Sequence, residues 1–248
     1  MLENLDVYNI LFLDIETVSA KPTFDDISDD FKPLWKKKSR SILRVKEEDL
    51  TDEMVTDAYT NRAAIFAEFG KIVCISVGFL SKREDGEMMI RLTSFASDDE
   101  RQLLLDFAEM LNKHYNLPSK HSICGHNLRE FDVPYICRRM IVNRVPFPNL
   151  LKISGKKPWE TKHLLDTLEM WKFGDYKNYT SIKVLTALLD LPSPKDDIDG
   201  SEVGGVYWKE NDLKRIAVYC EKDVLACAQL LLRYNLQPKL EDSQVEHV

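Results

Sequence analysis

Four short apolar stretches have the length and patterning of β-strands. They cover residues 9–15, 72–80, 88–95 and 122–126. The first is an almost unbroken apolar run, as in a buried strand, and the third alternates between apolar and polar residues. Residues 164–168 fit either the end of a strand or the start of a helix, because periodicity does not separate the two over so short a run.

Apolar residues at helical spacing follow these stretches. Residues 97–100, Ser-Asp-Asp-Glu, have the form of a capping box and open a helix that is expected to end near Tyr115. Strands that come first, and a strand set between helices, predict a mixed β-sheet flanked by helices, hence an α/β fold. Further helices are expected after the fourth strand with Pro134 in the first turn, between a Thr180 or Ser181 cap and Pro192, and over residues 211–234.

The chain is expected to form one domain over residues 1–248. Residues 20–62 are polar with interleaved charges, and we interpret them as a partly helical insertion packed on that domain, with Thr51 as a helix cap. Residues 192–205 contain prolines, glycines and acids, which is typical of a surface loop. The polar tail from about residue 238 is expected to be loose.

Composition excludes some classes of protein. The formal net charge is −7, so no overall positive field would attract a polyanion, and any contact with nucleic acid must be local. Five cysteines stand singly with no CxxC pair, which indicates reduced core residues of a cytoplasmic protein. The sequence has neither a signal peptide nor an apolar run as long as a membrane span, so a soluble protein is expected.

Two carboxylates lie inside the first apolar stretch, in the run Leu-Phe-Leu-Asp-Ile-Glu-Thr-Val at residues 11–18. Asp14 and Glu16 are two residues apart, so a strand would direct both to the same face. Each carboxylate disfavours ionisation of the other, and a bound Mg²⁺ or Mn²⁺ would remove that conflict. The alternative is that Asp14 ends the strand and Glu16 begins a solvated loop.

Two later stretches also place acids next to apolar backbone. Asp132 opens the helix after the fourth strand, where it belongs to a metal site or simply caps that helix. Tyr219 and Asp223 are four residues apart on the final helix, hence on one face at the edge of the core. A salt bridge from Asp223 to a nearby lysine is the alternative. Acids in three separated segments need a shared countercharge, which a pair of metal ions supplies.

These stretches resemble the three motifs of the DEDD superfamily of 3′-5′ exonucleases, in its tyrosine subtype. Residues 14–16 are similar to the first motif, 127–132 to the second and 219–223 to the third. Nearly the whole chain shares the likeness, which is vaguest over the insertion. Residues 67–78, 163–167 and 195–201 are also similar to a stand-alone bacterial group related to the exonuclease domain of family B DNA polymerases.

The resemblance implies a ribonuclease H-like fold and hydrolysis of the terminal phosphodiester bond, with two divalent cations, Mg²⁺ or Mn²⁺, as cofactors. By this likeness Asp14 would bridge both ions. Glu16 and Asp223 would complete the first ion site, and Asp132 would hold the second ion largely through water. Tyr219 would orient the attacking water, since a phenol with a pKa near about 10 is a poor base at neutral pH.

The implied substrate is the 3′ end of a nucleic acid, single-stranded DNA in the simplest case, which is released as nucleoside monophosphates. Thr17, Asn127 and Phe131 are the expected contacts to the terminal nucleotide, although helix packing explains Phe131 equally well. We interpret His126 as structural, and Asp166 has no assigned role.

Two alternatives to a DNA exonuclease stay open. One is a 3′-5′ exoribonuclease with the same site, since nothing in the motifs reads a 2′-hydroxyl. The other is a non-catalytic nucleic-acid-binding or scaffold module of the same fold. No polymerase palm or thumb fits in the remaining length, so polymerase proofreading would need a partner chain. A protein partner in DNA repair or replication is left open.

Overall fold

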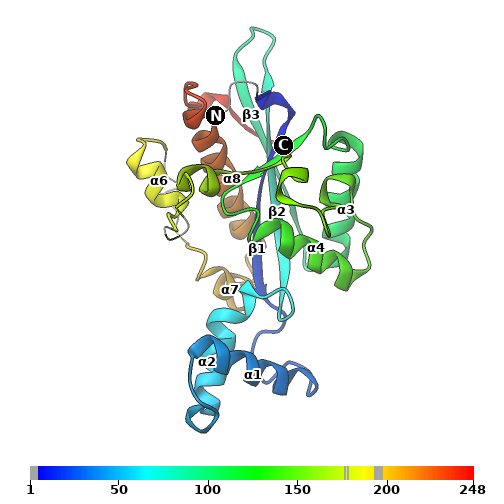
Figure 1. The fold of residues 1–248 in the computed structure, drawn as a ribbon, viewed down its shortest axis with the longest axis vertical. Helices are drawn as coiled ribbons and strands as arrows, with labels where there is room; N and C mark the ends of the chain where they lie inside the picture. The colour runs from blue at the N-terminus through cyan, green and yellow to red at the C-terminus, as the bar shows by residue number, and fades with distance from the viewer. Residues whose placement is uncertain (1–4, 176, 178, 193–197) are drawn as a thin grey trace.

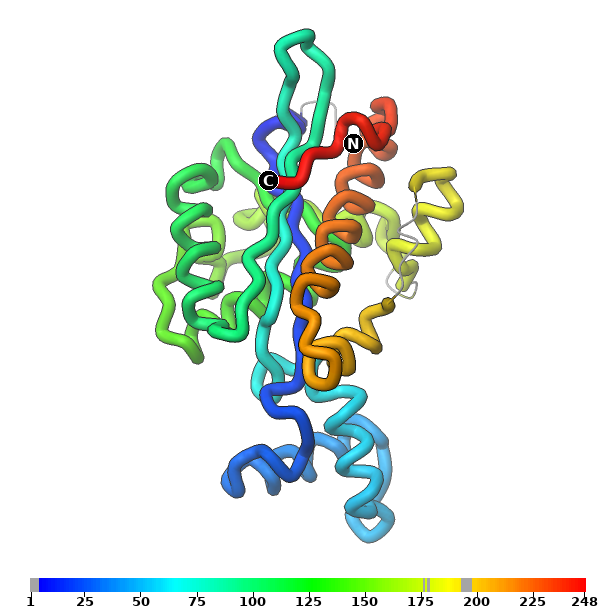
Figure 2. Tube along the Cα trace, turned by 180° about the vertical axis from the view of Figure 1, so that it is seen from behind, coloured from blue at the N-terminus to red at the C-terminus, as the bar shows by residue number. Residues whose placement is uncertain are grey.

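The computed structural model describes residues 5–175, 177, 179–192 and 198–248. In that part of the chain a single mixed sheet runs through the molecule, with helices on both sides (Figures 1 and 2). Its strand order is β5-β4-β1-β2-β3-β6. The strands are β1 (Ile10–Ser19), β2 (Gly70–Lys82), β3 (Met88–Ala96), β4 (Ser122–Gly125), β5 (Leu164–Asp166) and β6 (Val245–His247).

Strand β2 is antiparallel to both of its neighbours, β1 and β3. On the other side of β1 the strands β4 and β5 run parallel to it. This order and these directions are those of a ribonuclease H-like sheet, so the predicted α/β fold is confirmed. Residues 164–168 were expected to be either the end of a strand or the start of a helix, and they contain both. Strand β5 ends at Asp166, and a helix begins at Thr167.

Helices cover both faces of the sheet. Helices α3 and α4 lie on one face and the long helix α8 on the other, as Figures 1 and 2 show from opposite sides. The α-helices are α1 (Phe31–Leu43), α2 (Asp52–Arg62), α3 (Glu100–His114), α4 (Asp132–Asn143), α5 (Thr167–Lys172), α6 (Ile182–Leu188), α7 (Val203–Gly205) and α8 (Leu213–Tyr234). Shorter turns are η1 (Val7–Asn9), η2 (Glu47–Asp49), η3 (Ala63–Ile65), η4 (Asn149–Leu151), η5 (Pro158–Glu160), η7 (Asp242–Gln244) and the π-helix η6 (Val206–Glu210).

The alternation of side chains along β1 determines which way its acids point. Leu11 and Leu13 pack in the apolar cluster that α3 and α4 complete. Ile10 and Phe12 pack in the cluster that α8 completes. Because alternate residues of a strand share a face, the next residues in the Phe12 series, Asp14 and Glu16, are directed to the α8 side.

The start of α3 differs from the predicted capping box. Asp99, not Ser97, is the N-cap, and its side chain accepts a hydrogen bond from a first-turn amide. Glu100 does not bond back to the cap residue but pairs with Arg139 of α4 at 2.6 Å and accepts the backbone amide of Ile72 at 2.8 Å. The capping-box prediction was wrong because the acid that matched its pattern is used to join α3, α4 and β2.

The segment at residues 20–62 contains α1 and α2, which project beyond the end of β1 (Figure 1). It has a small apolar cluster of its own around Trp35, which is fully buried and donates its indole N–H to the Val55 carbonyl at 3.0 Å. Thr51 caps α2 as expected, with its side chain accepting the amide of Met54.

The tail was expected to be loose, and this prediction was wrong. Strand β6 pairs in parallel with β3 and forms one edge of the sheet. Upstream of β6, the side chain of Gln229 makes two buried hydrogen bonds to the backbone of Leu240, at 2.8 and 2.9 Å, and the Leu240 side chain is buried. The apolar Leu240 and the buried side-chain amide of Gln229 therefore attach the otherwise polar tail to the domain.

The segment 192–205 is also only partly the surface loop that was predicted. Residues 193–197 lie outside the described residues, and so do residues 195–197 of the stretch 195–201 that carried part of the resemblance. Beyond them, Ile198 and Val203 are buried against α8, and α7 begins at Val203. These two apolar residues fix the segment to the α8 face.

Candidate active site

Strand β1 and helix α8 bring four of the predicted site residues together. Asp14 and Glu16 point from β1 toward α8, and Tyr219 and Asp223 lie on one face of α8. The Tyr219 side chain hydrogen-bonds to Asp223, and the charge of Asp223 acts on both Asp14 and Glu16. Both acids lie within β1, so the alternative in which Asp14 ends the strand and Glu16 begins a loop was wrong.

Asp132 approaches the same point from α4, which lies on the face of the sheet opposite to α8. It is the first residue of α4, and Phe131 occupies the N-cap position without a capping hydrogen bond. The buried Asp132 carboxylate accepts hydrogen bonds from its own backbone amide and from that of Ile15, the residue between Asp14 and Glu16. The second motif thus contacts the first directly, and the helix-cap alternative does not describe Asp132.

Burial and mutual repulsion disfavour ionisation of these acids. The pKa of Asp14 is raised well above its usual value by burial and then by the charges of Asp132, Asp223 and Glu16. Burial and Asp223 likewise raise the pKa of Glu16. Burial raises the pKa of Asp132 to about 7, with Asp166 and Asp223 adding to it. Without a countercharge, the cluster would therefore take up protons near neutral pH.

The pKa of the Tyr219 hydroxyl is also raised, by burial first and then by Asp223, Glu16 and Asp14. A phenol in this setting keeps its proton at any physiological pH. The hydroxyl can therefore donate and accept hydrogen bonds, but it does not act as a free base.

A thiol that the sequence analysis treated as an ordinary core residue belongs to this cluster. Cys220 lies 3.4 Å from Oδ2 of Asp14 and 3.5 Å from the Asp14 carbonyl oxygen, close enough for its S–H to donate to either. One ligand atom from each of Asp14, Glu16 and Cys220 lies within 4.8 Å of the other two. The one sequence signal was that Cys220 precedes Asp223 by three residues and so shares its side of α8.

The donor set fits a hard divalent cation. Asp14, Glu16, Asp132 and Asp223 offer carboxylate oxygens, the ligands that Mg²⁺ and Mn²⁺ prefer. The raised pKa values of Asp14, Glu16 and Asp132 show that the fold concentrates negative charge at a buried point. Among the described side chains, no lysine or arginine forms an ion pair with any of these three acids. A cation would supply the missing charge.

Comparison with known proteins gives the family of the chain. Residues 65–247 match the family of predicted 3′-5′ exonucleases related to the exonuclease domain of PolB. The chain belongs to this family. Among solved structures, the family B DNA polymerase of the hyperthermophilic archaeon Pyrobaculum calidifontis is similar at 15% identity with a TM-score of 0.48, over 92% of this chain and 24% of the polymerase. No curated protein is similar enough in sequence to count as a relative.

The matched part of this exonuclease-family chain includes Asp132, Tyr219 and Asp223 but begins after β1. Asp14 and Glu16 therefore join the site through the structure rather than through the family match. Their link to the matched part is the contact of Asp132 with Ile15 and the shared electrostatic field with Asp223.

Asp166, which had no assigned role, organises the loop between β4 and α4. Its Oδ1 accepts the backbone amide of Asn127 and its Oδ2 that of Arg129, both at 3.0 Å. The same carboxylate caps α5 by accepting the amides of Leu168 and Glu169. Asn127 has a left-handed backbone with φ of 65°, so these hydrogen bonds hold the loop that leads to Asp132 in an uncommon conformation.

The three predicted substrate contacts differ in how free they are. The Thr17 hydroxyl donates to the Ala64 carbonyl at 3.0 Å, so that group is already used. Phe131 is half-buried and packs 5.5 Å from the ring of Tyr135. The Asn127 side chain contacts the hydroxyl of the exposed Tyr179, which lies 2.6 Å from Glu130. Tyr179 was not among the predicted residues, because no sequence pattern links it to the loop of residues 127–130.

His126 has the structural role that was predicted. Its Nε2 donates to the Thr180 carbonyl and its Nδ1 accepts from the Thr167 hydroxyl, both at 2.9 Å. Burial lowers its pKa, so the ring is neutral at physiological pH. A further residue that sequence analysis missed is Lys183 of α6, whose ammonium group lies 6.0 Å from the centre of the Tyr219 ring.

Across the described residues, no helix has both the length and the apolar content that crossing a bilayer requires.

Proposed function

We propose that the protein is a metal-dependent 3′-5′ exonuclease that hydrolyses the terminal phosphodiester bond of single-stranded DNA and releases nucleoside monophosphates. The observation that carries the proposal is the meeting of Asp14, Glu16, Asp132 and Asp223 at one buried point next to the hydroxyl of Tyr219. Membership in a family of predicted 3′-5′ exonucleases supports it.

Asp14, Glu16, Asp132 and Asp223 are the residues that would hold two divalent cations, Mg²⁺ or Mn²⁺. When bound, such a pair supplies activation of water and stabilisation of the charge that develops on the leaving 3′ oxygen. The mutual repulsion of the carboxylates gives a reason for the fold to keep them together, because only a positive ligand makes the arrangement favourable at neutral pH.

Tyr219 positions the attacking water through its hydroxyl and does not remove a proton, since its pKa is raised. Its hydrogen bond to Asp223 fixes the ring against the carboxylates. Cys220 orients Asp14 by donating its S–H to the Asp14 carboxylate. Asp166 is a positioning residue, because its carboxylate holds the loop that carries Asn127 and Phe131.

Asn127 and Phe131 are proposed to contact the terminal nucleotide, because both lie at the start of α4 beside Asp132 and neither side chain is fully enclosed. Thr17 is proposed only through its position next to Glu16, since its hydroxyl is engaged with Ala64. A partner protein in DNA repair or replication would supply the pathway in which the 3′ end arises.

The test is digestion of 5′-labelled single-stranded DNA, duplex DNA and RNA with Mg²⁺ or Mn²⁺. Wild type should shorten single-stranded DNA from its 3′ end, and Asp14→Asn and Asp223→Asn should not. Asp190→Asn is the matched control, because Asp190 is exposed and Asn tolerates its left-handed backbone. Faster digestion of RNA would favour the exoribonuclease, and binding of all three polymers without cleavage would favour the non-catalytic module.

A further inference from the structure

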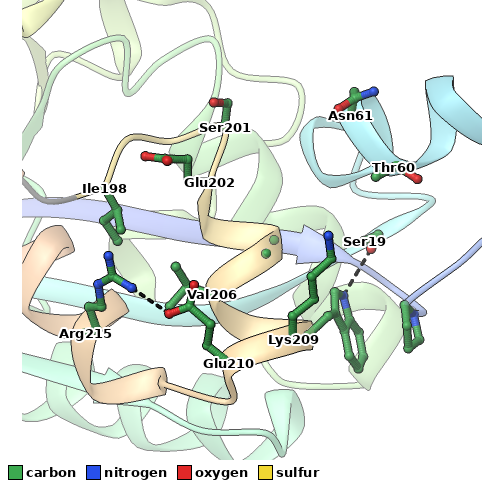
Figure 3. A pocket seen from close by; sticks show the side chains of 14 residues that line it. Ser19, Thr60, Asn61, Ile198, Ser201, Glu202, Val206, Lys209, Glu210 and Arg215 are labelled. Carbon is green, nitrogen blue, oxygen red and sulfur yellow. Dashed lines mark hydrogen bonds and ion pairs between the residues drawn. The ribbon is translucent and has the colours of Figure 1, made fainter.

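A second polar pocket lies beyond the carboxylates, where β1 ends. Its volume is about 390 Å³, within the range of small-molecule sites. Ser19 of β1, Thr60 and Asn61 of α2, and the segment formed by α7 and η6 line it (Figure 3). The insertion and the main sheet thus build this pocket together.

The pocket adjoins the candidate active site along two elements. Ser19 is three residues beyond Glu16 on β1, which is ~10 Å in a strand. The loop at Ile198 and Ser201 also lines the pocket, and between them a β-carbon on Gly200 would lie 4.0 Å from the Tyr219 hydroxyl. If the 3′ end of a nucleic acid strand lies at the carboxylates, about three stacked nucleotides, at ~3.4 Å each, span the distance to Ser19.

An aromatic side chain of fixed orientation forms part of the wall. Trp208 is only partly buried, and its indole N–H donates to the Ser19 hydroxyl at 3.1 Å. The ring of Tyr207 meets it edge-on at 4.8 Å. An indole held in this way next to a nuclease site suits stacking of an unpaired base, which needs no sequence-specific hydrogen bond.

The pocket also contains a cation that no carboxylate neutralises. Arg215 is paired with Glu210 at 2.6 Å, and Glu202 accepts the amide of Asp199 at 2.8 Å. Lys209 forms no ion pair within the described residues, and its side chain extends from η6 toward Thr60 and Asn61 (Figure 3). Its ammonium group is placed to meet a phosphate between the two walls.

Two neighbouring glycines leave the remaining wall open. Gly204 and Gly205 lie at the end of α7, and a β-carbon on either would meet nothing within 4 Å. Neither glycine has a positive φ, so the fold does not require glycine here, and alanine favours a helix more. The missing side chains instead let a ligand approach the backbone.

We propose that this pocket binds a nucleotide a few positions upstream of the 3′ terminus of single-stranded DNA. Its base stacks on Trp208, its phosphate pairs with Lys209, and its sugar lies against Gly204 and Gly205. The inference rests on the proposed function and names its substrate class, because a base that stacks on Trp208 cannot be paired in a duplex.

The test compares substrates that do and do not reach the pocket, namely thymidine 5′-p-nitrophenyl phosphate, a thymidine dinucleotide and a thymidine octanucleotide. Lys209→Gln and the double variant Gly204→Ala with Gly205→Ala should raise KM for the octanucleotide by about fivefold or more. KM for the two short substrates and kcat should stay as in wild type. The glycine variant should melt at the same or a higher temperature, and Lys113→Gln, at the exposed end of α3, is the control for loss of charge.

An unchanged octanucleotide KM in both variants would overturn the inference. If wild type hydrolyses none of the three substrates, the proposed function fails instead. The pocket is then judged by fluorescence anisotropy of a labelled octanucleotide: equal Kd for wild type and Lys209→Gln contradicts it, and weaker binding by the variant supports it.

Discussion

The carboxylate of Asp166 accepts the backbone amide of Asn127 at 3.0 Å and so joins the end of β5 to the loop that leads into the second motif. This contact explains why an acid outside the carboxylate cluster should matter for the proposed reaction. It sets the backbone through which Asp132 reaches Ile15.

Asp166→Asn should destabilise the protein and lower activity together. An amide keeps one acceptor but presents N–H to the amide of Arg129, which leaves a buried donor unpaired at a cost of about 1–3 kcal/mol. Urea denaturation measures the first effect and kcat on single-stranded DNA the second. Asp190→Asn should change neither, and full activity of Asp166→Asn would remove the positioning role.

The metal-free protein should lose stability as pH rises. The folded pKa of Asp132, about 7, is above the unfolded value of about 3.9, so its contribution is fully present below about pH 4 and is lost as pH rises through about 7. Asp14 and Glu16 act in the same direction. Denaturation in EDTA between pH 4 and pH 8 should show a fall on the order of 3 kcal/mol.

Asp132→Asn should flatten this fall, because the amide has no charge to bury. Above pH 7 the variant should be more stable than wild type in EDTA and should gain less from added Mn²⁺. If the free energy of unfolding falls equally with pH in the variant and in wild type, the pKa of Asp132 is not raised in the folded protein.

Removal of one partner from the buried ion pair between Glu100 and Arg139 should be strongly destabilising. Both side chains are mostly buried, and their charged groups lie 2.6 Å apart. The Glu100 carboxylate also accepts a hydrogen bond from the Ile72 backbone amide. Glu100→Ala leaves a buried guanidinium unpaired and should cost about 3–5 kcal/mol. Glu109→Ala, on the exposed face of the same helix, should cost less than about 0.5 kcal/mol by the same denaturation assay.

The attached tail gives a further test. Leu240→Ala should cost about 2–4 kcal/mol, because its side chain is only 2% exposed beneath β6. Leu236→Ala is the control, since that leucine is 92% exposed just past α8. Equal melting temperatures for the two variants would mean that the tail contributes nothing to stability.

The sheet and the carboxylate cluster were predictable because each depends on local spacing. Two acids at i and i+2 in a strand share a face, and Tyr219 and Asp223 at i and i+4 share a side of a helix. The wrong predictions concern residues whose partners are distant in sequence. Glu100 matched a capping box but pairs with Arg139, and the tail is held by Gln229 and Leu240.

The site residues that were not predicted also depend on contacts between segments that are distant in sequence. Cys220 and Lys183 enter the site only because α8 packs beside β1 and α6 packs against α8, and no periodicity in the sequence gives that packing. The pocket at Ser19 likewise needs the insertion and η6 to meet, although more than a hundred residues separate them. Spacing predicts faces, whereas tertiary packing decides which faces meet.

The most direct test of the carboxylate cluster is Mn²⁺ binding followed by electron paramagnetic resonance at pH 8, in the absence of any nucleic acid. Wild type should bind two Mn²⁺ ions per chain, and Asp190→Asn should bind as many. Asp14→Asn should lose at least one of them, because the charges of Glu16, Asp132 and Asp223 all act on Asp14. Equal Mn²⁺ stoichiometry and affinity in wild type and Asp14→Asn would contradict the account.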